Sequence, residues 1–259
     1  MASKNDKKGK YSSVQKAALI ILLIAALGVF VFSGYMLIER QSEYNASRNE
    51  YDNLRDQFKQ TEQAADVASS SIDFDGLKQE NPETVGWIEI PSAGISYPVV
   101  QAEDNEKYLT TGFDGNESKS GAIFLDYKSQ PDMMGYHTII YGHHMRDGSM
   151  FANLVDFKDA DYFEKNSQIT LYTPERTLNL TVIAAYAQSA SDTAVRQFEF
   201  ADDADFHAFA DGRVKLSQNK REGADEALES VDRLYTFITC SYEGDDMRTI
   251  VHAIEMAEQ

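Results

Sequence analysis

Residues 234–255 read LYTFITCSYEGDDMRTIVHAIE. Two runs rich in β-branched and aromatic residues, 234–240 and 249–255, flank a polar stretch with glycine and aspartate. This pattern predicts two strands joined as a hairpin, with Cys240 ending the first and Arg248, directly before the run 249–255, starting the second. The two side chains would then meet at one rim of a sheet.

Cys240 is the only cysteine of the chain, which excludes a disulfide framework and a cysteine-based zinc cluster. A lone cysteine is either a small buried hydrophobic side chain or a reactive thiol. A thiolate needs a neighbouring cation or dipole at neutral pH, and Arg248 is a permanent cation. Position alone leaves both interpretations open.

Six further β-like runs precede this hairpin, separated by clusters of Gly, Pro, Asn and Asp. They are VGWIEI (85–90), ISYPVV (95–100), GAIFLDY (121–127), HTIIYGHH (137–144), QITLY (168–172) and LNLTVIAAYA (178–187). Eight runs at irregular spacing predict a mostly antiparallel barrel or sandwich. Two helical inserts are expected, at 149–157 with Ser149 as N-cap and at 202–214, and the polar stretch 217–230 is expected to be a loop.

The N-terminus predicts a membrane anchor. Residues 17–38 hold 22 residues without a charge, and Lys4, Lys7, Lys8, Lys10 and Lys16 precede them. This length spans a bilayer as a helix, and positive charge marks the cytoplasmic side. We therefore expect a cytoplasmic tail at 1–16, an anchor at 17–38 and the rest of the chain outside. A cleaved signal peptide is the alternative, but the apolar run is long for a signal core.

The segment 39–71 is expected to be a juxtamembrane helix and linker, with the extracellular catalytic domain at 72–259. Tyr44, Tyr51, Leu54 and Phe58 follow a helix-face spacing, so this helix either packs on the domain or acts as a stalk. The net charge of −18 argues against a nucleic-acid partner and against broad docking on anionic lipid.

Tyr141-Gly142-His143-His144 carries the best-placed histidines. Adjacent residues of a strand point to opposite faces, so only one of the two can face a given site unless the strand has ended. The spacing does not favour a metal site, and no cofactor is expected. His137, His207 and His252 are interpreted as structural or surface residues. Cysteine, histidine and arginine together suit acyl transfer.

These motifs resemble the sortase family. TFITC at 236–240 resembles the signature Thr-Leu-x-Thr-Cys, with Phe237 replacing leucine, and YGHHM at 141–145 resembles the sortase histidine strand. Arg248 matches the arginine on the strand after the cysteine. Four further stretches resemble class B sortases: NPETVGWIEI (81–90), YPVVQAEDNEKYL (97–109), SGAIFLDY (120–127) and DGSMFANL (147–154).

The resemblance implies an eight-stranded sortase barrel with helical inserts on an N-terminal anchor. It implies a cysteine transpeptidase that cleaves a C-terminal sorting signal, Asn-Pro-x-Thr-like or Leu-Pro-x-Thr-Gly-like, after threonine. The acyl group, held as a thioester, passes to an amine of the peptidoglycan precursor. Cys240 would be the nucleophile, His143 the general acid and base, and Arg248 the group that stabilises the oxyanion or substrate.

The resemblance also implies a substrate groove lined by Asn105, Leu109, Tyr141 and Thr239. Ile238 stands where class B members often have serine. Three alternatives to a wall-anchoring sortase remain: a class B-like pilin polymerase that uses a pilin lysine, a non-catalytic stalked surface-binding module, and a generic secreted cysteine hydrolase. The sequence shows neither the C-terminal membrane segment nor the Asp-Pro-aromatic lid of class C polymerases.

Overall fold

The computed structural model describes residues 12–59, 72–241 and 246–255, and the chain divides into two units, Met1–Ala46 and Ser47–Gln259. Helix α1 (Ser13–Phe58) carries the apolar run, and its large apolar side chains between Leu19 and Ile38 are exposed. By length and composition alone, this helix could span a membrane.

The last turns of α1 belong to the globular unit. Tyr51, Leu54 and Phe58 are buried, and the Tyr51 hydroxyl donates to the carbonyl of Gly121 at 2.9 Å. The apolar stripe therefore packs on the barrel from residue 47 onward. The globular unit therefore includes the last turns of α1, which the expected domain boundary at residue 72 leaves outside the catalytic domain. Ser69 to Ser71, in the expected linker, lie outside the described residues.

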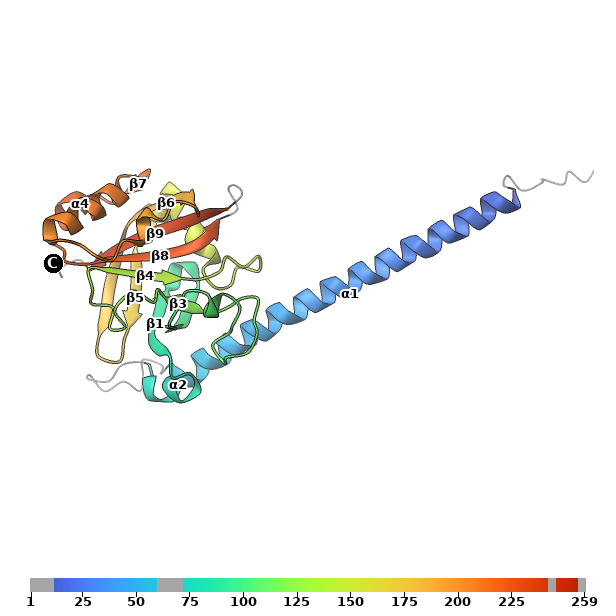
Figure 1. Ribbon diagram of the computed structural model, residues 1–259, viewed down its shortest axis with the longest axis horizontal. Coiled ribbons are helices and arrows are strands. Elements are labelled where there is room, and N and C mark those ends of the chain that lie inside the picture. Colours follow the sequence, from blue (N-terminus) through green and yellow to red (C-terminus); the bar gives the residue numbers. More distant parts are fainter. Residues whose placement is uncertain (1–11, 60–71, 242–245, 256–259) are drawn as a thin grey trace, which may run out of the picture. The chain divides into compact units, whose positions relative to one another are not determined.

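The eight predicted runs form the eight strands of a closed barrel (Figure 1). These strands are β1 (Thr84–Ile90), β2 (Ile95–Val100), β3 (Ile123–Leu125), β4 (His137–Tyr141), β5 (Gln168–Tyr172), β6 (Thr177–Ser189), β8 (Leu234–Ser241) and β9 (Met247–Glu255). Hydrogen-bonded neighbours follow the order β5-β1-β2-β3-β4-β8-β9-β6, and β6 pairs with β5 to close the sheet. The predicted barrel is confirmed.

The barrel is mixed, because β3 lies parallel to β2 and β8 lies parallel to β4. The other pairings around the barrel are antiparallel. The β4–β8 pairing joins strands that are far apart in sequence, and these two strands carry the histidine and cysteine motifs. Trp87, Phe237 and Tyr235 are among the fully buried side chains of the core.

Short helices fill the connections. They are α2 (Phe74–Glu80), η1 (Pro91–Ala93), η2 (Lys107–Leu109), η3 (Ala152–Lys158), α3 (Ala160–Lys165), η4 (Ala194–Arg196), α4 (Asp203–Val214) and α5 (Ala224–Leu228). The predicted insert at 202–214 is confirmed as α4, whose N-cap Asp202 accepts from the backbone of Asp205 at 2.9 Å.

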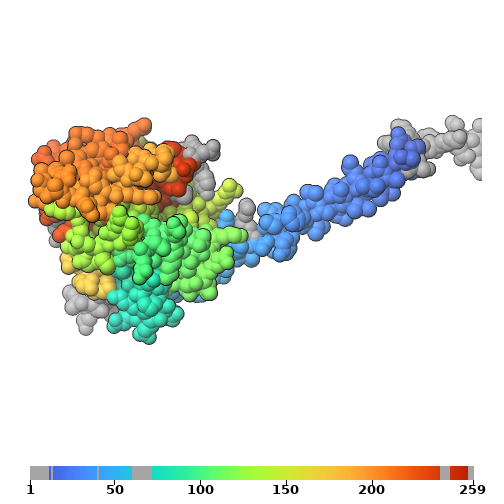
Figure 2. Space-filling view, viewed as in Figure 1, coloured from blue at the N-terminus to red at the C-terminus, as the bar shows by residue number. Residues whose placement is uncertain are grey.

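Two local predictions are wrong. The stretch 217–230 is not simply a loop, because it holds the short strand β7 (Asn219–Lys220), which pairs with β6, and helix α5. Ala224 and Leu228 of α5 pack in a cluster with Phe206 of α4. Figure 2 shows this region in orange on the same face of the globular unit as the green surface of residues 100–130.

Ser149 is not a helix N-cap. The insert after β4 is the 3-10 helix η3, which begins at Ala152 and has no side-chain cap. The Ser149 hydroxyl instead donates to the Asp147 carboxylate at 2.6 Å, so this serine stabilises the turn that precedes the helix.

Candidate active site

The β8–β9 hairpin sets Cys240 and Arg248 opposite one another. They are register partners on the two antiparallel strands, and Thr239 pairs with Thr249 in the next position. The predicted hairpin is therefore present. The side chain of Cys240 lies outside the described part of the structure.

Strand β4 brings the histidine motif beside the same rim. Tyr141 is the register partner of Ile238, and the Gly142 N–H donates to the Ile238 carbonyl at 3.2 Å. A Cβ on Gly142 would clash with Ile123 and would lie 2.7 Å from Cγ of Phe151, so glycine is required here. His143 follows directly, next to the end of β8.

A pocket of about 440 Å³ lies at this rim. Its walls include six of the residues singled out from the sequence: Asn105, Leu109, Tyr141, His143, Thr239 and Arg248. They come from the 101–110 segment, the end of β4 and the β8–β9 hairpin. The structure therefore brings together all the predicted site residues whose side chains it describes.

His143 is held by a main-chain carbonyl. Its Nε2 lies 2.7 Å from the carbonyl oxygen of Leu109. A carbonyl only accepts, so Nε2 carries the hydrogen in the neutral ring and Nδ1 is the basic nitrogen. Gly121, at φ +56°, lies against this contact, because an added Cβ there would be 3.2 Å from Cδ2 of His143.

His144 lies in a different place. It forms an isolated antiparallel bridge with Met150 and lines a separate pocket of about 450 Å³ together with Arg146 and Asn153. The two histidines therefore face different pockets. The reason differs from the strand argument, because β4 has already ended at Tyr141.

Arg248 lines the pocket with a side chain that is 29% exposed. Its Nη1 donates to the carbonyl of Met247 at 3.1 Å and lies 3.5 Å from the carboxylate of Asp246, which is 70% exposed. An ion pair this exposed contributes little to stability. The guanidinium thus keeps donors for a ligand in the pocket.

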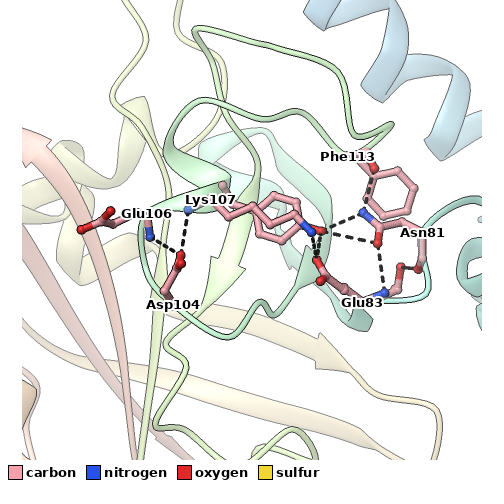
Figure 3. A network of polar contacts seen from close by, with 8 residues as sticks. Asn81, Glu83, Asp104, Glu106, Lys107 and Phe113 are labelled. Atoms are coloured by element: carbon pink, nitrogen blue, oxygen red, sulfur yellow. Dashed lines mark hydrogen bonds and ion pairs between the residues drawn. The ribbon is translucent and has the colours of Figure 1, made fainter.

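A short turn carries the groove residues Asn105 and Leu109. At one end, the Asp104 carboxylate accepts from the N–H groups of Glu106 and Lys107 (Figure 3). These backbone hydrogen bonds lower the pKa of Asp104. The turn is therefore capped by its own first side chain.

The same turn is anchored at its other end to the segment before β1. Lys107 pairs with Glu83 at 2.6 Å, and the Tyr108 hydroxyl also donates to Glu83 (Figure 3). Burial raises the pKa of Glu83, but the hydrogen bonds from Lys107 and Tyr108 outweigh it and lower the pKa overall. Asn81 adds a bond from its amide to the Phe113 carbonyl at 2.8 Å. These contacts fix the main-chain carbonyl that holds His143.

Asn105 and Tyr141 share one acceptor. The Asn105 amide donates to Oδ2 of Asp126 at 2.9 Å, and the Tyr141 hydroxyl donates to the same oxygen at 2.8 Å. Burial, followed by the charge of Asp126, raises the pKa of Tyr141 well above its ordinary value. Both groove side chains are thus fixed in orientation.

Sequence analysis missed Asp126 and Arg196. Asp126 lies within the run SGAIFLDY, but no role was assigned to it. Arg196 ends η4, and its guanidinium lies 5.6 Å from the centroid of the Tyr141 ring. No sequence motif marks the 190–200 segment, so only the contact with Tyr141 across the fold connects this arginine with the pocket.

Thr239 is 1% exposed and pairs across the strands with the fully buried Thr249. Within the described ranges, neither hydroxyl has a hydrogen-bond partner. Ile238 also lines the pocket and gives it an apolar surface where a serine would offer a hydroxyl.

The histidines interpreted as structural lie away from this pocket. His137 and His252 are buried on either side of Thr236, at 2.7 Å and 2.9 Å from its hydroxyl. The chain continues from His252 to the Tyr186 hydroxyl and from His137 to the Gln197 carbonyl. Burial lowers the pKa of His137 to about 4 and lowers that of His252 well below its ordinary value.

Comparison with known proteins agrees with this geometry. The family model of the sortase domain matches residues 88–256. The chain belongs to the sortase family. Sortase B of Staphylococcus aureus is 28% identical over 243 residues, which cover 92% of this chain and 96% of the relative. Sortase B of Listeria monocytogenes is 28% identical over 225 residues, covering 86% and 90%.

Among solved structures, sortase B of Clostridium perfringens is 31% identical with a TM-score of 0.67, and the match covers 71% of this chain and 100% of that one. This sortase is therefore of class B, and it is a cysteine transpeptidase.

Proposed function

We propose that this sortase cleaves a C-terminal sorting signal after its threonine and transfers the protein to an amine of the peptidoglycan precursor, which anchors surface proteins to the cell wall. The main support is the register of β8 and β9, where Cys240 opposes Arg248 beside a pocket that His143 also lines.

In the first half of the reaction, the Cys240 thiolate attacks the threonine carbonyl carbon. Arg248 donates to the oxygen as negative charge develops there. The C–N bond to the next residue breaks, and the leaving amine takes a proton from protonated His143. The substrate protein, up to and including this threonine, remains as a thioester on Cys240.

In the second half, the acceptor amine loses a proton to His143 and attacks the thioester carbonyl. The new amide forms, the C–S bond breaks, and the thiolate is regenerated. Because Nε2 of His143 faces the Leu109 carbonyl, the exchanged proton belongs on Nδ1. One imidazole can therefore serve both halves without changing its backbone contact.

The groove supports a signal of the Asn-Pro-x-Thr kind. Asn105 and Tyr141 supply polar contacts, while Leu109, which is 41% exposed, supplies an apolar one. A polar wall suits a signal that begins with an amide side chain. A wholly aliphatic signal would leave the second Asn105 amide N–H without a partner.

We place the enzyme at the cell membrane, with residues 17–38 as a single span, 1–16 in the cytoplasm and the barrel outside. The lysines before the span support this orientation. Protease added to intact cells stripped of wall should remove the barrel, whereas full protection of the barrel would contradict the orientation.

The test of function uses the full chain in detergent micelles with an Asn-Pro-Gln-Thr peptide and an amine acceptor. Mass spectrometry should find cleavage after threonine and a product joined to a peptidoglycan stem amine. Cleavage at another bond would contradict the proposal. Ligation to a pilin lysine alone would identify a pilin polymerase.

A further inference from the structure

Asp126 is a buried carboxylate that the proposed reaction does not use. It follows β3 directly and is 1% exposed. Within the described ranges it forms no ion pair, and its oxygens accept only from Asn105, Tyr141 and the backbone of Lys128 at 2.9 Å. A buried carboxylate is unfavourable unless hydrogen bonds compensate it. Its three donors supply that compensation, and two of them are groove side chains.

The hydrogen bonds to Asp126 determine which donors and acceptors of the groove remain available to a ligand. The Asn105 amide is held at both ends, because Nδ2 donates to Asp126 and Oδ1 accepts from the Tyr127 N–H at 3.1 Å. One amide N–H and one acceptor lone pair remain for a ligand. The Tyr141 hydrogen is committed to Asp126 and its oxygen also has the Arg196 guanidinium as a hydrogen-bonding neighbour, so toward a ligand this oxygen can only accept, with a remaining lone pair.

A ligand group that both donates and accepts matches this set. A primary amide does so, whereas an aliphatic side chain leaves the second Asn105 amide N–H and the remaining Asn105 lone pair unused. Without Asp126 the Asn105 amide would be held only by the Tyr127 N–H, and the Tyr141 hydroxyl could rotate. The groove would then lose its fixed pattern of donors and acceptors.

We propose that Asp126 is a positioning residue that sets the preference of this sortase for a sorting signal beginning with asparagine over one beginning with leucine. The inference rests on the proposed function, because it assigns the signal to this groove. Asp126 acts through Asn105 and Tyr141 and does not touch the reacting atoms.

The test compares two peptides that differ only at the first signal residue, Asn-Pro-Gln-Thr and Leu-Pro-Gln-Thr. The full chain in detergent micelles should favour the asparagine peptide by at least about tenfold in kcat/KM. In Asp126→Ala this ratio should fall toward one, mainly because KM for the asparagine peptide rises while kcat is kept. Asp126→Asn, which keeps the shape and one acceptor oxygen, should restore part of the preference.

Ser129→Ala is the matched control. Ser129 is 4% exposed in the same turn, and its hydroxyl accepts from the Ile139 N–H at 3.1 Å without touching Asn105 or Tyr141. It should lower Tm and leave the peptide ratio unchanged. If Asp126 were purely structural, its variants would also lower Tm and leave the peptide ratio unchanged. An unchanged ratio in Asp126→Ala and Asp126→Asn would therefore overturn the proposal.

Binding measurements separate this proposal from the proposed reaction. Fluorescence anisotropy with Cys240→Ala should show the asparagine peptide binding more tightly, and the double variant Cys240→Ala/Asp126→Ala should lose most of that difference. This result supports the role of Asp126 even where no cleavage occurs. Equal affinity of Cys240→Ala for both peptides would overturn it, and so would a preference that the double variant keeps.

Discussion

The main-chain carbonyl of Leu109 accepts a hydrogen bond from Nε2 of His143 at 2.7 Å. The segment that supplies this carbonyl also supplies Asn105 to the groove. Substrate contacts and the orientation of the imidazole therefore depend on one turn, which Asp104, Lys107 and Tyr108 hold in place.

Gly121→Ala should disturb this contact. Gly121 has a φ of +56°, and an added Cβ would clash with the Tyr108 carbonyl and lie 3.1 Å from that of Leu109. Because the turn must shift, we expect kcat/KM to fall at least about tenfold, as misplacement of a catalytic group does. The control is Gly94→Ala, with a φ of +66° and nothing within 4 Å of the added Cβ. It should cost about 1–2 kcal/mol of stability and leave activity intact. Wild-type activity in Gly121→Ala would contradict the role of the Leu109 contact.

His143 and His144 should differ sharply when each is replaced. His143→Ala should lose about 10²–10⁴-fold in kcat, the range of general acid–base catalysis. His144→Ala should lose much less, because His144 lines the other pocket. Steady-state kinetics on both variants decides the matter. Equal losses would show that the two pockets do not act separately.

Arg248 should affect turnover more than stability. Lysine keeps the charge but loses the planar set of donors, so Arg248→Lys should lower kcat, and Arg248→Ala should lower it further. One oxyanion donor contributes about 2.7–4 kcal/mol to lowering the barrier.

Asp246→Asn is the matched control for Arg248. It removes the exposed ion pair, and asparagine tolerates the positive φ of 60° at this position. Unfolding stability should change by less than about 1 kcal/mol and turnover should hold. Normal turnover in both arginine variants would remove Arg248 from the site.

The buried histidine chain predicts acid sensitivity. In the folded state the pKa of His137 is about 4, whereas the ordinary value is 6.5. Between these values the unfolded chain binds more protons, so the free energy of unfolding should fall as pH is lowered from about 6.5. His252 shifts in the same direction, and each histidine contributes at most about 1.4 kcal/mol per pH unit, the limit for one proton bound only by the unfolded chain. Urea titrations from pH 7 to pH 5 should show this slope, and His137→Gln should reduce it. An identical slope in His137→Gln would contradict the assignment.

Much of the barrel could be predicted from local sequence. Runs of β-branched and aromatic residues become strands because they suit a pleated, half-buried surface, and all eight did so here. The two parallel pairings could not be predicted, since no local pattern shows that β4 lies beside β8. Helix α5 was missed because only Ala224 and Leu228 are buried in a polar stretch.

The site was predictable where a motif marked it. His143, Thr239 and Arg248 line one pocket, as their motifs indicated. Asp126 and Arg196 were missed because their meaning depends on contacts across the fold, with Asn105 and Tyr141 for one and with the Tyr141 ring for the other. An aspartate or arginine in a sequence does not reveal whether its side chain is buried or which residue it contacts.

The most direct test is the intact mass of the full chain after mixing with an Asn-Pro-Gln-Thr peptide and no acceptor amine. We predict an adduct equal to the peptide up to its threonine, attached at Cys240 and released by hydroxylamine, as a thioester should be. Cys240→Ala should form no adduct and should cleave no peptide. Cleavage by Cys240→Ala at a rate near that of the wild type would contradict the account.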